Sequence, residues 1–206
     1  MFAAPWEGVV AVVPLELYTA THVMIGTMDL GRRRLSDHLN DTGADVIPLE
    51  EAWIGDLSHG SVLMRLAPAN FRKHDLIAVS AQDRPDPLRA AYVKTVTMKV
   101  AASAGPFFLT GDIHLAAGTN FDIRRLFGPG SRSFVPLTNA TMRYTPKPKL
   151  DVPHSVLLVR TDRVEFAGLV EGTPTSMAFL AMAIEERLRT LTGAGENERG
   201  AGGAPR

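Results

Sequence analysis

The chain has 206 residues, of which 45% are hydrophobic, enough for a sizeable buried core in one or two domains. Its 22 basic and 22 acidic residues cancel, which argues against a protein covered by nucleic acid or held on a membrane by basic residues. The absence of cysteine excludes disulfides, cysteine zinc sites, iron–sulfur clusters and a thiol nucleophile.

The start of the chain predicts a strand and not an export signal. Its first seven residues lack a basic region, and the apolar run at 9–17 is interrupted by Pro14 and Glu16. A second apolar run, at 177–184, is far shorter than the about 20 residues that span a bilayer. We therefore expect a soluble, cytoplasmic protein without a membrane span.

Ten short segments are rich in β-branched residues and bounded by turn residues, which predicts strands. They are 9–19, 23–30, 46–54, 61–66 and 76–80 in the first half, and 95–101, 107–115, 133–144, 155–160 and 163–170 in the second. A short helical turn is expected within each half, and the proline-containing stretch 82–91 separates the halves. One short sheet cannot cover both of its faces, so each half predicts a small barrel or a strongly bent sheet.

The chain ends with one long predicted helix, at 173–193, and a tail, at 194–206. Apolar residues recur every three to four positions of the helix, and Gly193 is placed to stop it. We expect its apolar face to form an interface with the β domains or with another chain, made of Phe179, Leu180, Ile184, Leu188 and Leu191. The tail has no apolar anchor and is expected to be disordered.

Four short matches recur in the same order in both halves and predict a tandem duplication, with domains at 1–83 and 84–172. The matched pairs are 25–30 with 110–115, 35–39 with 121–126, 46–52 with 134–140, and 74–79 with 154–159. They align Pro48 with Pro136, and His74 with His154 as equivalent strand starts. The fold class predicted is mainly β: two tandem small β-barrel or bent-sheet domains plus one C-terminal α-helix.

Residues 34–40 read Arg-Leu-Ser-Asp-His-Leu-Asn, and a Pro-Leu strand follows at 47–49. In this pattern the first copy resembles an uncharacterised small bacterial domain family. The second copy departs from it, because 120–126 reads Asn-Phe-Asp-Ile-Arg-Arg-Leu. The resemblance implies a domain and not an activity. Modules of this size also resemble Sm-like or SH3-like small barrels, a likeness of fold that carries little functional weight.

The sequence holds no pattern typical of a catalytic or metal site. The six histidines are scattered, and only Asp112 and His114 share one face of a predicted strand, where a third ligand would be needed to hold a metal. There is no Gly-x-Ser-x-Gly elbow and no phosphate-binding glycine loop. We therefore expect no catalytic residue, no metal and no cofactor.

The neutral total hides a charge asymmetry between the halves. Residues 1–83 hold 6 basic and 11 acidic side chains, whereas residues 84–172 hold 12 and 7. Basic residues with an aromatic among them can bind single-stranded nucleic acid. The candidate binding residues are Arg124, Arg125, Arg132, Arg143, Tyr144, Lys147 and Lys149, and a smaller cluster is Arg32, Arg33 and Arg34. A solvated face is the favoured interpretation of these charges, and the alternatives are self-association or packing between the oppositely charged halves and binding of a nucleic acid or another anion.

These observations favour a non-enzymatic binding or assembly module, which is a protein–protein interaction or scaffold protein that binds another protein or itself. An Sm-like RNA-binding protein is one alternative, and an enzyme with a site between the two copies is another. A continuous basic groove would favour RNA, a convergent pocket would favour the enzyme, and a large exposed apolar patch would favour protein assembly.

Overall fold

The computed structural model describes residues 12–31, 33–81, 95–116, 122–128, 130–147 and 151–170. These residues are mainly β, as the sequence predicts. The predicted linker at 82–91, the C-terminal helix at 173–193 with its five interface residues, and the tail at 194–206 all lie outside them. The described residues contain no helix with the length and apolar character needed to cross a bilayer.

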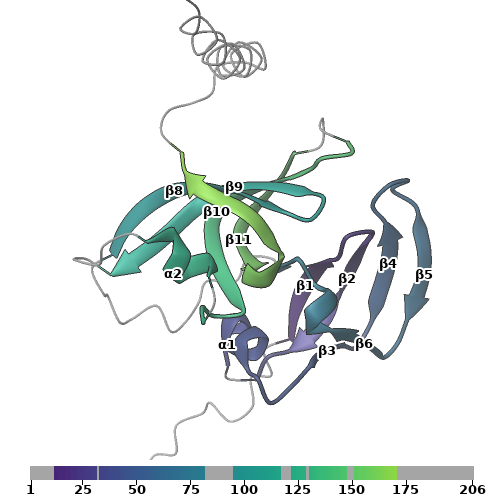
Figure 1. Cartoon of the computed structure of the whole chain (residues 1–206). Coiled ribbons are helices and arrows are strands. Elements are labelled where there is room, and N and C mark those ends of the chain that lie inside the picture. Colours follow the sequence, from purple (N-terminus) through teal and green to yellow (C-terminus); the bar gives the residue numbers. More distant parts are fainter. Residues whose placement is uncertain are drawn as a thin grey trace, which may run out of the picture. The chain divides into compact units, whose positions relative to one another are not determined.

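The first segment, residues 12–81, contains seven strands, one helix and one 3₁₀ turn (Figure 1). They are β1 (Val12–Tyr18), β2 (His22–Asp29), α1 (Leu35–Asn40), β3 (Val46–Leu49), β4 (Ala52–Asp56), β5 (Val62–Leu66), β6 (Ala69–Arg72), the 3₁₀ turn η1 (Lys73–Asp75) and β7 (Ala78–Ala81). Strand β1 forms because alternate apolar residues enter the core, and Val13, Leu15 and Leu17 are buried.

The second segment, described from residue 95 to residue 170, contains five strands, four of them with ten or eleven residues. Its elements are β8 (Thr95–Ala104), β9 (Phe107–Ala116), α2 (Ile123–Phe127), β10 (Phe134–Tyr144), β11 (Asp151–Arg160), the 3₁₀ turn η2 (Thr161–Arg163) and β12 (Val164–Leu169). Each of the ten predicted strand ranges overlaps an observed strand, and only β6 falls outside them.

Ten strands form one antiparallel sheet in the order β12-β8-β9-β10-β11-β7-β1-β2-β4-β5, and β3 pairs with β6 in a second, two-stranded sheet. The sheet is not closed. The sequence predicted two separate small β domains, whereas here β7 of the first segment pairs with β11 of the second. That pairing places the described residues as far as Leu169 in one compact unit.

The two segments have the same order of elements and the same order of paired strands. The paired strands of the first segment follow one another in the order β7-β1-β2-β4-β5, and those of the second segment in the order β12-β8-β9-β10-β11. Each strand of the first order corresponds to the strand at the same place in the second order, and β3 and β4 together correspond to the single long strand β10. Pro48 lies opposite Asn70 in the first segment, and Pro136 lies opposite Leu158 in the second. Pro136 is 88 positions after Pro48, and Leu158 is 88 positions after Asn70. The same shift relates η1 to η2 and β7 to β12. We call residues related in this way equivalent.

The expected alignment of His74 with His154 is wrong. His74 lies in η1, and its equivalent is Asp162 in η2. His154 lies inside β11, and its equivalent is Leu66, because His154 is opposite Ala140 and Leu66 is opposite Ala52. The histidines match in residue type and not in their place in the sheet.

Two glycines mark the same close approach in both segments. Gly26 lies opposite Leu15, and Gly111 lies opposite Val100, which is a shift of 85 positions. A Cβ on Gly26 would lie 1.9 Å from the backbone oxygen of Glu51, between β3 and β4. A Cβ on Gly111 would lie 3.2 Å from the oxygen of Thr138, beside an irregularity in β10. Only glycine allows the neighbouring strand to bend over this point.

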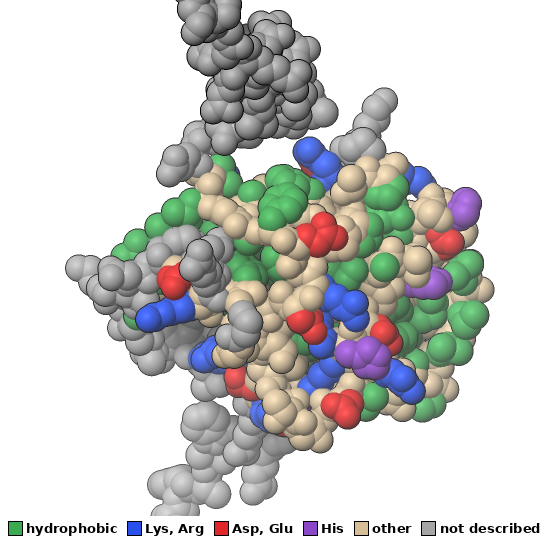
Figure 2. Space-filling model, viewed as in Figure 1, with side chains coloured by type: hydrophobic (Ala, Val, Ile, Leu, Met, Phe, Trp, Pro, Cys, Tyr) green, Lys and Arg blue, Asp and Glu red, His purple; other side chains and the backbone are tan. Residues whose placement is uncertain are grey.

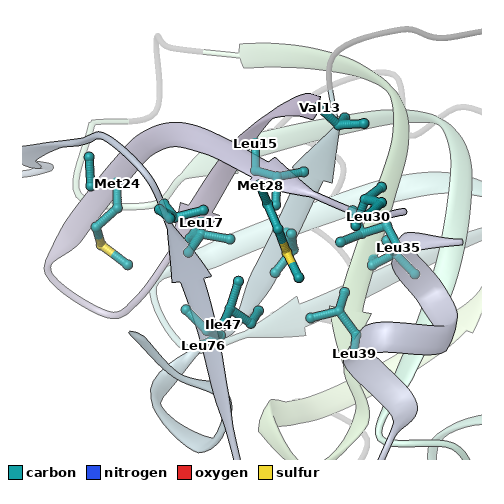
Figure 3. Close-up of a cluster of buried hydrophobic side chains, with 14 of the residues drawn as sticks. Val13, Leu15, Leu17, Met24, Met28, Leu30, Leu35, Leu39, Ile47 and Leu76 are labelled. Atoms are coloured by element: carbon teal, nitrogen blue, oxygen red, sulfur yellow. The ribbon is translucent and has the colours of Figure 1, made fainter. Parts of the chain in front are cut away.

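The buried side chains form two clusters. In the first, residues of β1, β2 and α1 point toward Ile47 and Leu76 (Figure 3). Fully buried leucines such as Leu15, Leu17 and Leu49 each contribute about 1.5–3 kcal/mol. The second cluster lies between β8, β9, β10 and β11.

The two clusters share strands across the β7–β11 junction. Phe134 and Leu158 of the second segment pack in the first cluster. Tyr18, Ile77 and Ala78 of the first segment pack in the second. Each segment therefore completes the core of the other, and we expect neither to be fully stable alone.

Candidate functional site

The basic residues described in the second segment lie at different ends of β10 and are partly paired with carboxylates. Arg132 precedes β10, whereas Arg143 lies at the other end of that strand. The guanidinium of Arg143 donates two hydrogen bonds to the carboxylate of Asp151, at 2.6 and 2.8 Å. This bidentate ion pair raises the pKa of Arg143 and lowers the pKa of Asp151. Arg125 lies 3.9 Å from Asp122. Paired charges of this kind leave less positive potential for a polyanion.

The other predicted residues of this group are dispersed. The side chain of Tyr144 is partly buried and packs against Phe107, with ring centroids 5.8 Å apart, so it is no open platform for a base. Lys147 is exposed in the turn after β10. Lys149 and the side chain of Arg124 lie outside the described residues.

The smaller arginine cluster supports α1. Arg33 lies 2.9 Å from Asp41, beyond the end of the helix, and also donates to the backbone oxygen of Asp37. The pKa of Asp41 is lowered, first by the backbone N–H of Gly43 and then by Arg33. Arg34 is the N-cap residue of α1. Arg32 lies outside the described residues.

Arg33 and Arg132 come together at an open hollow of about 460 Å³ between α1 and the start of β10. Its other lining residues are Ser36, Asp37, Asn40, Asp41 and Thr42. The fold places them together because the Asn40 side chain hydrogen-bonds both the N–H and the C=O of Phe134. Acidic and basic side chains both line the hollow, and Arg33 is already paired with Asp41. The hollow therefore lacks the concentrated positive charge of an anion-binding site.

A buried polar cluster lies on three adjacent strands, β1, β7 and β11. Tyr18 donates a 2.7 Å hydrogen bond to Glu16, and His154 Nδ1 lies 3.0 Å from Ser80 Oγ. Burial, together with the neighbouring Glu16, raises the pKa of Tyr18. Burial lowers the pKa of His154, whose side chain is 4% exposed.

This cluster does not have the geometry of a catalytic relay. In a serine–histidine–carboxylate relay, the two imidazole nitrogens contact the serine and the carboxylate separately. Here His154 Nδ1 faces both Ser80 and Glu16, the latter at 3.8 Å, while Nε2 is buried without a hydrogen-bond partner among the described residues. Ser80 is also buried, so a substrate could not reach its hydroxyl. The cluster is part of the junction between the segments.

The pair Asp112 and His114 lies on the surface of β9. His114 Nε2 is 2.7 Å from the hydroxyl of Thr138, and Asp112 accepts a hydrogen bond from Asn139. Neither a third acidic group nor a second histidine joins them, and no group of three such side chains elsewhere in the described residues could hold a metal ion. These contacts fix the bend in β10, where Asn139 has a positive φ of 47°.

The apolar surface at the end of the sheet is the feature that sequence reasoning missed. Strand β5 lies last in the sheet order, and all five of its residues are exposed. The exposed apolar side chains of β2, β4 and β5 are Ile25, Trp53, Val62, Leu63, Met64 and Leu66. Hydrophobic side chains are visible in Figure 2 on the side where Figure 1 places β4 and β5. We call these six residues the apolar edge surface.

Arg65 is the one charged residue of β5, and it is held on this surface. Its guanidinium lies over the Trp53 ring, 5.4 Å from the centroid, and it makes a 2.8 Å ion pair with Glu51. These contacts hold the arginine over the face of the sheet and not over the side of β5 that points away from β4. On that side the backbone N–H and C=O groups of β5 pair with no other strand among the described residues. Arg65 lies opposite Trp53, whereas Met64 and Leu66 lie opposite Ile54 and Ala52 and so point to the other face of the sheet. The register of the two strands shifts between Met64 and Val62.

A second hollow, of about 320 Å³, borders β6. It lies between β6, the 3₁₀ turn η1 and residues of β2 and β4. Its lining residues are Thr19, His22, Met24, Ile54, Asn70, Phe71, Arg72, Asp75 and Leu76. The three residues of β6 in this set belong to a strand that pairs only with β3 in the described part of the chain. The open sheet edge therefore continues from β5 to β6.

The fold and these surfaces define a mainly antiparallel β protein whose described residues form an open sheet that ends at β12 and β5 and carries a partly exposed apolar surface. No family model, curated protein or solved structure was found to match the chain.

Proposed function

We propose that this protein is a non-enzymatic assembly module, which binds a protein chain through the apolar edge surface and the open side of β5 and β6. The observation that carries the proposal is the end strand β5, whose five residues are all exposed and four of them apolar. Native proteins usually protect such an edge with charge, proline or a covering segment, because an open strand pairs readily with another chain.

The size and character of the surface also support protein binding. Leu63, Met64 and Val62 are between 49% and 66% exposed, and Trp53 is 49% exposed. These apolar side chains lie on both faces of the sheet edge, and exposed apolar side chains mark protein interfaces, whose centres are enriched in tryptophan and methionine. Arg65, stacked on Trp53, adds a residue type that often dominates binding energy.

We also propose that the two segments arose by tandem duplication of one small bent-sheet module. The shared strand order supports this, together with a shift of 85 positions in β1 and β2 and of 88 positions from β3 to β7. Gly26 and Gly111 support it independently, since each allows the same strand crossing. Duplication would explain why the end strands β5 and β12 are equivalents of β11 and β7, the two strands that pair at the centre of the sheet.

Photo-crosslinking at position 63 tests the proposed function. Leu63 is replaced by the photoreactive residue p-benzoylphenylalanine, and the chain is irradiated in cells that express it. The side chain of Leu63 is exposed and lies on the strand that we expect to be covered, so adducts with protein should form. They should disappear when Val62→Lys and Met64→Lys are added.

The matched control carries the photoreactive residue at Thr145, which is exposed in the turn after β10. Adducts at position 63 that exceed this control and depend on Val62 and Met64 support the proposal. Yields at 63 that are no greater than at 145 would contradict it.

A further inference from the structure

We infer that the occupant of the open β6 edge is the β12 edge of a second copy of this chain, in a head-to-tail arrangement. This inference rests on the proposed function and names its partner. Among the described residues, the strands at the two ends of the sheet are equivalents of the two strands that pair at its centre. Within the chain, β7 pairs with β11. The equivalent of β11 is β5 with β6, and the equivalent of β7 is β12.

The central junction supplies the register of the contact between copies. Ala78 lies opposite Val159, and Ser80 lies opposite Leu157. The N–H of Arg160 donates to the oxygen of Ile77 at 2.9 Å. With the shift of 88 positions, Phe71 of one copy should lie opposite Phe166 of the next, and Arg72 should lie opposite Glu165.

Apolar residues stand exposed at the open edges where their equivalents are buried at the junction. Phe134 is 1% exposed, whereas its equivalent Val46 is 41% exposed. Ala78 is 0% exposed, whereas its equivalent Phe166 is 57% exposed. Pairing of β12 with β6 would cover both Val46 and Phe166, as the central junction covers their equivalents.

Leu66 fits the same arrangement. Its equivalent, His154, is buried in the junction, whereas Leu66 is 41% exposed. Around His154 lie Tyr18 and Ser80, whose equivalent positions in the second segment are the smaller Ser103 and Gly168. A neighbouring copy would therefore offer Leu66 a surface of small residues in place of the polar cluster.

The charges at the two open edges are complementary. Arg72 is exposed on β6, and its side chain makes no ion pair or hydrogen bond within the described part of the chain. Glu165 is exposed on β12, and its one hydrogen bond there is a long one, 3.4 Å, from Ser103. Opposite charges directly across a strand pair stabilise it, so these residues favour β6 against β12 over either edge against itself.

Such a contact is heterologous, because each copy contributes a different edge. It repeats from copy to copy, and the result is a ring where the rotation closes and a filament where it does not. It also differs from a two-fold dimer in a way that single cysteines reveal. The chain has no cysteine of its own, so an introduced pair reports only the designed contact.

The experiment mixes two full-length single variants, Arg72→Cys and Glu165→Cys, under mild oxidation. Directly opposite residues of antiparallel strands are about 4.5–5.5 Å apart at Cα, within the range that a disulfide bridges. The mixture should yield a two-chain product that neither variant forms alone. A mixture of Thr145→Cys with Glu165→Cys is the matched control and should give only background.

Each other outcome has a defined meaning. Efficient crosslinking of Arg72→Cys alone would show edges of the same kind pairing, which overturns the head-to-tail inference and leaves the proposed function intact. No product above the control, together with position-63 adducts to a different protein, also overturns the inference alone. No product and no position-63 adducts overturn both. Should Arg72→Cys fail to fold, the pair Asn70→Cys and Ala167→Cys reports the same register.

Discussion

The side-chain amide of Asn40, at the end of α1, pairs with the backbone of Phe134, at the start of β10. Phe134 N–H donates to Asn40 Oδ1 at 2.8 Å, and Asn40 Nδ2 donates to Phe134 O at 3.1 Å, across 94 positions of sequence. Phe134 itself is buried in the core cluster of the first segment. The contact therefore locks the second segment onto the first.

Asn40→Ala should destabilise the chain by about 1–3 kcal/mol, because it leaves buried backbone groups of Phe134 without partners. Chemical denaturation measures the loss. Asn40→Asp is the matched control, since it keeps the acceptor for the Phe134 N–H and removes only the donor, and it should lose less. An unchanged denaturation midpoint in Asn40→Ala would show that the contact does not hold the segments together.

Gly26→Ala should destabilise the chain by roughly 1–3 kcal/mol, because its Cβ would lie 1.9 Å from the backbone oxygen of Glu51 and the strand must move. Gly168→Ala is the control. No atom lies within 4 Å of a Cβ at that position, so its stability should change by no more than about 0.5 kcal/mol. Thermal melts of the two variants compare them directly, and equal losses would contradict the close approach at Gly26.

Stability should fall as the pH drops below about 6.5, the ordinary pKa of histidine. Burial lowers the pKa of His154, although the nearby Glu16 opposes this in part, so the folded chain keeps the ring neutral where the unfolded chain takes up a proton. The contribution is fully present above pH 6.5 and is lost below it, by at most about 1.4 kcal/mol for each pH unit.

His154→Leu, which places there the residue found at the equivalent Leu66, should remove this part of the pH dependence. Denaturation of both proteins at pH 7.5 and pH 5.5 measures it. The free energy of unfolding should drop less on acidification in the variant than in the original chain. The same drop in both would show that protonation of His154 is not what weakens the fold.

The strands were predictable from local pattern, and the way in which the segments join was not. The range 107–115 follows the alternation that produced the observed strand Phe107–Ala116. Asn40 is the last residue of the motif that carries the family resemblance, yet nothing local indicates that its amide reaches Phe134. The pairing of Ala78 with Val159 likewise depends on two strands far apart in sequence.

The sequence prediction matched residues of the same type, whereas strand register determines which positions of the two segments correspond. His74 and His154 look alike, but the pairing of Pro48 with Asn70 and of Pro136 with Leu158 shows that they are not equivalent. The charge count of the second half predicted one basic cluster that includes Arg132 and Arg143, but these two residues lie at opposite ends of β10. The exposure of β5 had no signal in its sequence, because a short apolar run reads the same in a central strand as at an edge.

Reversing single charges at the proposed contact should weaken association of the chain with itself. Arg72→Glu and Glu165→Arg each place like charges across the strand pair and should lower the association constant roughly fivefold. The double variant restores opposite charges and should recover most of the loss. Light scattering at low and high salt measures this, and the differences should shrink at high salt. Failure of the double variant to recover would mean that these residues do not face one another.

Sedimentation equilibrium of the full chain over a concentration series tests the central claim, that copies join through their open sheet edges. We predict a mass that rises above that of one chain as concentration increases. We also predict that Phe166→Lys, which changes an exposed side chain on β12, keeps the fold and stays at the mass of one chain. A single-chain mass for the unchanged protein at every concentration, or the same masses for protein and variant, would contradict the account.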